Sequence, residues 1–88
     1  MIRIVVLQRG WVVVGRMSHE HEIVLRDAAV IRRWGTTKGL GSLRGGPAEN
    51  TELDYAGTVR AHELGVVLTI DCDQDAWDPV LSRLGRES

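Results

Sequence analysis

Short runs of β-branched and apolar residues, separated by turn signals every eight to ten residues, restrict the fold of this 88-residue chain more than any other feature. Runs of this length suit β-strands and are too short for most helices. Only the last part of the sequence has a helical pattern. We therefore predict a mainly β protein: a small, strongly curled antiparallel sheet or partly open barrel with one short C-terminal helix.

Five to seven extended segments are expected. Gly15 lies inside the second and indicates a bulge or bend of the kind that lets small sheets curl. The run 66–72 is almost continuously apolar, so we expect it to be buried on both faces. Ala56-Gly57 is typical of a turn, and Trp11 is expected in the core or at a subunit interface. The segments are 2–8, 11–17, 22–27, 28–34 (a separate strand or a bent continuation), 51–55, 58–60 and 66–72.

The C-terminal helix is expected over about residues 75–84. Asp73 or Asp75 would supply its N-cap, Pro79 would lie in its first turn, and Gly85 would end it. Apolar residues recur at i, i+3, i+4 and i+7, a stripe that should dock on the sheet or on a neighbouring subunit. The stripe consists of Trp77, Val80, Leu81 and Leu84.

Residues 1–88 are expected to form a single domain. A chain of this size buries only about 60–65% of its extended surface, so a subunit interface would add stability and we expect a homo-oligomer. The single cysteine, Cys72, excludes an internal disulfide and is expected to pack as a small hydrophobe. Because no apolar run approaches about 18 residues and no secretion signal is recognisable, we expect a cytoplasmic protein with no membrane partner.

The charges are divided unevenly along the chain. Residues 1–45 contain eight basic and three acidic side chains, whereas residues 46–88 contain three basic and nine acidic ones. This division indicates an anion-binding face in the first half of the chain. It is equally explained by electrostatic pairing of the two halves, within one subunit or between subunits.

The segment from Trp34 to Gly46 holds five of the ten glycines, three hydroxyls and one lysine, within a long loop over residues 35–50. Loops of this length are usually functional or disordered. Glycines let consecutive amides converge on an anion, while hydroxyls and cations add donors and charge, and an indole can stack on a base. A mobile hairpin loop, whose glycines only satisfy turn geometry, is the alternative. The candidate ligand-binding residues are Arg33, Trp34, Thr36, Thr37, Lys38, Gly39, Gly41, Ser42 and Arg44.

This loop matches neither common nucleotide-binding motif. A Walker A loop requires a lysine after its last glycine, followed by Ser or Thr, whereas Lys38 precedes Gly39. A dinucleotide fingerprint requires a strand–helix–strand unit, which the pattern of elements does not provide. The sequence therefore suggests that the loop holds an anion without the machinery of a nucleotide-hydrolysing enzyme.

Metal and catalytic motifs are weak. His19 and His21 would share one side of a strand, but a solvated turn explains them better. The acidic residues between Asp71 and Asp78 begin like a calcium loop yet lack its glycine, and helix capping accounts for them. Neither Ser18 beside His19 nor the pair His62 and Glu63 forms a catalytic pattern that sequence alone can identify. We expect a non-enzymatic protein without cofactor or metal.

Two family resemblances extend this interpretation. Residues 10–16 followed by 24–30 resemble the second and third strands of Sm-like and SH3-like barrels, over about a quarter of the chain. Residues 7–11, 28–41 and 69–72 resemble an uncharacterised family of small phage and prophage proteins, whose likeness spans nearly the whole chain. The second resemblance implies a phage accessory protein that works in the cytoplasm of a bacterial host.

The functional hypothesis combines the loop with the phage resemblance. We expect an oligomeric protein that sequesters a small anionic, nucleotide-like ligand, such as a cyclic dinucleotide or a cyclic ADP-ribose derivative that serves as a bacterial immune second messenger, and thereby counteracts antiphage defence. One alternative is an Sm-like or SH3-like module that binds nucleic acid; another is a structural or protein-interaction protein of the phage. The nucleic-acid alternative would use Arg9, Arg16, Arg26, Arg32 and Arg33.

Overall fold

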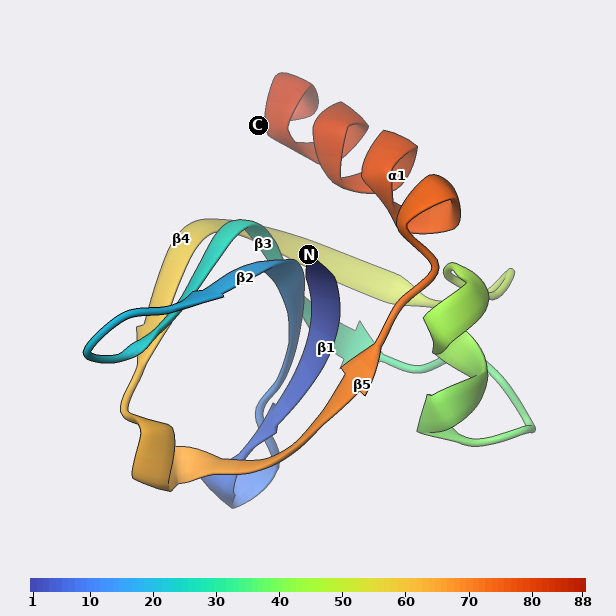
Figure 1. Ribbon diagram of the computed structural model, residues 1–88. Helices are drawn as coiled ribbons and strands as arrows, with labels where there is room; N and C mark the ends of the chain where they lie inside the picture. Colours follow the sequence, from blue (N-terminus) through green and yellow to red (C-terminus); the bar gives the residue numbers. More distant parts are fainter.

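The computed structural model describes all 88 residues and contains one five-stranded antiparallel sheet followed by one helix (Figure 1). The strand order is β4-β3-β2-β1-β5, and β4 and β5 form the two edges, so the curled sheet stays open. The predicted fold class is confirmed. The elements are β1 (Ile2–Leu7), η1 (Gln8–Gly10), β2 (Val12–His19), β3 (Ile23–Arg33), η2 (Leu40–Gly45), β4 (Glu52–Ala61), η3 (Glu63–Gly65), β5 (Val66–Asp71) and α1 (Gln74–Glu87), where η denotes a 3₁₀ turn.

The sheet buries apolar side chains on both of its faces. Successive residues of a strand point to opposite faces, so neighbours such as Ile4 and Val5 enter different hydrophobic clusters. One cluster is built from strand residues alone, including Val13 and Leu25. The other lies between the sheet, helix α1 and the η2 turn, and it includes the fully buried Trp77. The loop and the helix together therefore form a second layer over one face of the sheet.

The bend predicted at Gly15 is present. A Cβ atom at Gly15 would lie 3.1 Å from the Cβ atoms of both Leu25 and Ala28, so strands β2 and β3 approach too closely there for a side chain. The pairing of β2 with β3 shifts register at the same place, and Asp27 opposite takes a positive φ of 49°. The segments predicted over residues 22–34 consequently form one long bent strand.

Strand β4 differs from the sequence-based prediction. Ala56-Gly57 is not a turn: the chain stays extended from Glu52 to Ala61 as one strand. Gly57 has a positive φ of 73°, and the pairing with β3 shifts register on both sides of Ala28, its partner. The turn signal in the sequence therefore marks a bulge inside a continuous strand, because cross-strand pairing with β3 overrides the local preference.

The burial predicted for residues 66–72 was wrong. Strand β5 is an edge strand and pairs only with β1, so Val67 and Leu68 are 61% and 48% exposed, contrary to the expected burial on both faces. Hydrophobic composition alone does not show which strand ends the sheet, and this is the reason for the error. Trp11 is 58% exposed beside η1 and does not enter the core of this chain, so its place at a subunit interface stays a prediction.

Helix α1 closely follows the prediction. Asp73 caps it, its side chain accepting hydrogen bonds from the amides of Asp75 and Ala76 at 3.0 and 3.4 Å. The apolar stripe docks on the sheet, with Trp77 and Leu81 fully buried. The helix continues past Gly85 to Glu87, and Pro79 lies beyond its first turn, so the predicted end and proline position were wrong. This helix, like the 3₁₀ turns, lacks the length and apolarity needed to cross a membrane.

Candidate ligand-binding loop

The loop between β3 and β4 is anchored to the rest of the molecule. Leu43 in η2 is 1% exposed and belongs to the cluster beneath α1. The indole Nε1 of Trp77 donates a buried hydrogen bond of 2.7 Å to the carbonyl of Leu43, and the amide of Asp73 donates one of 2.8 Å to the carbonyl of Arg44. These contacts hold the loop against the start of the helix.

The two ends of the loop are also tied together. The hydroxyl of Thr51 donates to the Trp34 carbonyl at 2.6 Å and accepts from the Ala48 amide at 2.8 Å. Gly35 has a positive φ of 68°, and a Cβ atom there would overlap the backbone carbonyl of Asn50. Gly35 is therefore required by close packing at the base of the loop, a role that differs from the anion binding suggested by the glycine count.

Two of the three candidate hydroxyls are used inside the loop. The Ser42 hydroxyl donates to the Gly39 carbonyl at 2.8 Å, and the hydroxyls of Thr36 and Ser42 lie 3.2 Å apart in a further hydrogen bond. Thr36 also accepts from the Lys38 amide at 3.1 Å. Only Thr37 is exposed without a hydrogen bond from its side chain. Two of the hydroxyls therefore stabilise the loop itself. The groups left to contact a ligand are chiefly the cations of the loop and the Trp34 indole.

The cations of the loop have no carboxylate partners. Arg33, Lys38 and Arg44 are all exposed, and none takes part in an ion pair. Arg44 makes only a long contact of 3.4 Å to the Gly41 carbonyl. No acidic residue occurs between Asp27 and Glu49 in the sequence, and Glu52, which lies opposite Arg33 in the sheet, pairs with Arg32 instead. The structure places these three charges on one anchored segment.

Trp34 is 43% exposed where β3 enters the loop. Gly39 has a positive φ of 88°, whereas Gly41 does not, and a Cβ atom added at either glycine would have no neighbour within 4 Å. No pocket is present on the surface of the chain. The predicted site residues therefore share one segment and present an open surface to solvent.

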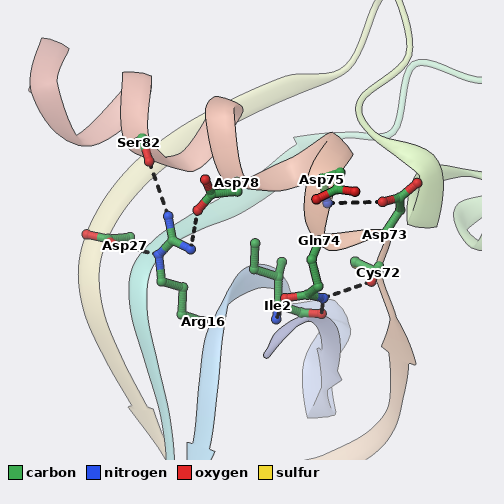
Figure 2. Close-up of polar contacts among 9 residues, drawn as sticks. All are labelled: Ile2, Arg16, Asp27, Cys72, Asp73, Gln74, Asp75, Asp78 and Ser82. Carbon is green, nitrogen blue, oxygen red and sulfur yellow. Dashed lines mark hydrogen bonds and ion pairs between the residues drawn. The ribbon is translucent and has the colours of Figure 1, made fainter.

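A polar cluster that the sequence did not reveal joins the sheet to the helix (Figure 2). The Arg16 guanidinium lies 2.9 Å from Asp27 and 2.6 Å from Asp78, and it donates to the Ser82 hydroxyl at 3.2 Å. The hydrogen bond to Asp27, followed by the interactions with Asp78, raises the pKa of Arg16 above its ordinary value against the opposing effect of burial. This cluster connects β2, the β3 bulge and α1.

A second unpredicted contact joins the first residue of β1 to the helix. The side chain of Gln74 accepts a hydrogen bond from the Ile2 amide at 2.6 Å and donates to the carbonyls of Ile2 and Cys72 at 3.0 and 2.8 Å (Figure 2). The side-chain amide of Gln74 thereby extends the hydrogen bonding between β1 and β5 beyond the end of β5. Nothing in the sequence marks this glutamine, because its partners are backbone atoms 72 and two residues away.

The histidines and remaining carboxylates serve local contacts. His19 lies 2.9 Å from Glu63, and the ring of His62 accepts from the Leu64 amide at 3.1 Å. Asp71 pairs with Arg3 at 3.0 Å. No three His, Cys, Asp or Glu side chains are grouped closely enough to hold a metal ion.

The five arginines of the nucleic-acid alternative fall into two sets. Arg16 is bound to two carboxylates, and Arg32 lies 3.2 Å from Glu52 and 2.9 Å from Asp54. The other three, Arg9, Arg26 and Arg33, have no ion pair. No known family model and no curated protein matches this chain.

Proposed function

We propose that this protein is a non-enzymatic binding module whose loop takes a small phosphate-bearing ligand of the nucleotide type. The observation that carries the proposal is the absence of carboxylate partners for Arg33, Lys38 and Arg44, on a segment without acidic residues. Elsewhere, Arg16 and Arg32 show that basic side chains of this chain do form ion pairs when carboxylates are near. Unpaired cations on an anchored loop attract anions without first breaking internal contacts.

The remaining groups fit a nucleotide better than a bare anion. Trp34 provides a half-exposed ring at the mouth of the loop, on which a base can stack. Thr37 has a free hydroxyl, and Lys38 and Arg44 can neutralise phosphate charge. Because a single chain offers only an open surface, we propose that an oligomer covers the ligand. The phage resemblance favours a signalling nucleotide of bacterial immunity, which the protein would sequester.

Isothermal titration tests this proposal. The panel comprises cyclic dinucleotides, cyclic ADP-ribose derivatives and inorganic phosphate as a control for simple charge attraction. We expect at least one nucleotide to bind with a dissociation constant below about 10 µM, equivalent to about −7 kcal/mol. Absence of binding by every nucleotide at that concentration would overturn the proposal.

Matched charge variants locate the site. Lys38→Gln and Arg44→Gln should weaken binding by about tenfold each, the effect of losing one charged hydrogen bond of about 1.4 kcal/mol. Arg83→Gln removes the same charge from α1, far along the chain, and should leave affinity within about twofold. Equal losses in all three variants would show that net charge, not the loop, determines binding.

A single-stranded oligonucleotide in the same titration distinguishes the nucleic-acid alternative. Oligonucleotide affinity would fall steeply with salt, with a slope of about −0.7 per phosphate contact. Binding of the oligonucleotide in preference to every small nucleotide would favour an extended basic face that includes Arg9 and Arg26 over the loop.

A further inference from the structure

The outer edge of β5 is the most exposed apolar part of the molecule. Residues 64–70 contain no charged side chain, and within them Leu64, Val67 and Leu68 are 79%, 61% and 48% exposed. Edge strands of monomeric proteins are usually protected by charges, prolines or bulges that prevent pairing with another chain. β5 has an irregularity opposite Val6 and Leu7 and one exposed charge, Asp71, at its last residue, whereas its residues 66–70 carry neither a charge nor a proline.

The backbone of this edge is also free to pair. β5 hydrogen-bonds with β1 alone, and the Cys72 amide donates to the Ile2 carbonyl at 3.2 Å. Hydrogen-bonding residues alternate in an antiparallel ladder, so the backbone groups of Thr69 and Asp71 point away from β1. Figure 1 shows β5 at the margin of the sheet, with no strand beyond it and with the η2 turn beside its C-terminal end. The edge therefore offers both hydrogen-bonding groups and apolar side chains.

The opposite edge of the sheet is protected. Strand β4 carries Asp54 and Arg60 among its exposed residues; Asp54 pairs with Arg32 of β3, and Arg60 pairs with Glu22 just before β3. Gly57 interrupts its pairing with β3 and bends it. β5 has fewer of these devices, because its one charge, Asp71, lies at its last residue and leaves residues 66–70 uncharged. The contrast between the two edges of one sheet indicates that β5 is covered by a partner in solution.

We propose that the partner is a second copy of this chain, and that two β5 strands pair antiparallel across a two-fold axis at Leu68. This register places Val66 opposite Ile70 and Thr69 opposite Val67, so no charge is buried. Asp71 faces Gly65 and keeps its ion pair with Arg3.

Shifting the pairing by two residues is unfavourable in both directions. One shift leaves only Val66, Val67 and Leu68 of β5 opposite each other, instead of residues 66–70. The other places Asp71 opposite Val67. The chain sequence therefore favours a single self-complementary register, as a two-fold interface requires. Burial of the β5 edge also supplies the additional stability that a chain of 88 residues lacks on its own.

The test measures mass in solution without ligand, so its outcome is independent of the binding function proposed above. Size-exclusion chromatography with light scattering at about 100 µM should show a dimer, because mass action favours association at that concentration. Leu68→Arg places an unpaired charge in the interface and should weaken dimerisation by about 100-fold or more. Thr58→Arg adds the same charge on exposed β4 and should leave the dimer intact.

A monomeric wild-type protein at that concentration would overturn the proposal and would favour a segment of another protein as the partner of the β5 edge. A larger assembly disrupted by both arginine variants would overturn it in favour of pairing between β4 and β5. Circular dichroism of Leu68→Arg checks that the fold is kept. In the proposed register, Leu68→Cys should form a disulfide with its own copy under mild oxidation, since directly opposed non-hydrogen-bonded residues have Cα atoms about 4.5 Å apart. A dimer without this cross-link would refute the register.

Discussion

Replacing Trp77 by phenylalanine should test whether the candidate loop is held in place from below. The indole is fully buried, and its Nε1 donates the 2.7 Å hydrogen bond to the Leu43 carbonyl. That carbonyl also accepts from the Gly46 amide at 3.0 Å, so the variant would leave it with one partner. The lost hydrogen bond is therefore worth about 1 kcal/mol, its ordinary net contribution, and not the larger penalty of an orphaned buried group.

The smaller ring adds a packing loss. Complete truncation of a buried tryptophan to alanine costs about 3–5 kcal/mol, and a phenylalanine retains most of that contact, so we assign about 1–2 kcal/mol to the cavity. The sum is about 2–3 kcal/mol, a substantial part of the about 4–13 kcal/mol expected for a chain of this length. With an m value of about 1.5 kcal/mol per M, the urea midpoint should fall by about 1.3–2 M.

Urea unfolding followed by far-UV circular dichroism measures this change. Trp34→Phe is the matched control, because Trp34 is 43% exposed and its side chain makes no hydrogen bond. Substitutions at such positions usually change stability by no more than about 0.5 kcal/mol. The reasoning would be refuted if Trp77→Phe changed the midpoint no more than Trp34→Phe does.

Three further predictions concern the loop base, the sheet–helix junction and the thiol. Gly35→Ala should lower the free energy of unfolding by more than about 2 kcal/mol, because its Cβ atom would overlap backbone at a positive φ. Gly41→Ala has open space around its Cβ atom and should change the free energy of unfolding by no more than about 0.5 kcal/mol. Equal urea midpoints for the two variants would contradict this prediction. Arg16→Gln should cost about 1 kcal/mol, and a double-mutant cycle with Asp78→Asn should show coupling that shrinks at high salt. Burial raises the pKa of Cys72 from 9.0 to about 11, so its contribution to stability is complete below pH 9 and lost as the pH rises through 11. Urea midpoints should therefore fall over this range in the wild type, and more steeply than in Cys72→Ala.

Local patterns predicted the strands and the helix well because their signals are local. The Asp73 cap and the apolar stripe that includes Trp77 follow directly from residue type and spacing, and both are present. The bend at Gly15 was also predictable, although its cause, the close approach of Ala28, was not. Periodicity describes one strand at a time, so it could not show that 66–72 forms an edge.

The loop shows a different limit. Its glycines and hydroxyls suggested ligand contacts, but Gly35 packs against backbone, and Thr36 and Ser42 bond each other. Leu43, the residue that anchors the loop, looked like an ordinary apolar residue within a polar segment. Contacts between residues distant in sequence, such as Arg16 with Asp78, have no local signal. Whether a polar side chain faces a ligand or its own fold depends on such contacts.

The three tryptophans differ in burial, so each can serve as an intrinsic fluorescence probe of a different part of the protein. Indole fluorescence shifts to longer wavelength as water reaches the ring, so the buried Trp77 should emit in the blue part of the spectrum and the exposed Trp11 and Trp34 further to the red. Retaining one indole at a time separates the signals. Trp34 then reports events at the mouth of the loop, Trp77 reports release of the loop from the helix, and Trp11 serves as an internal reference.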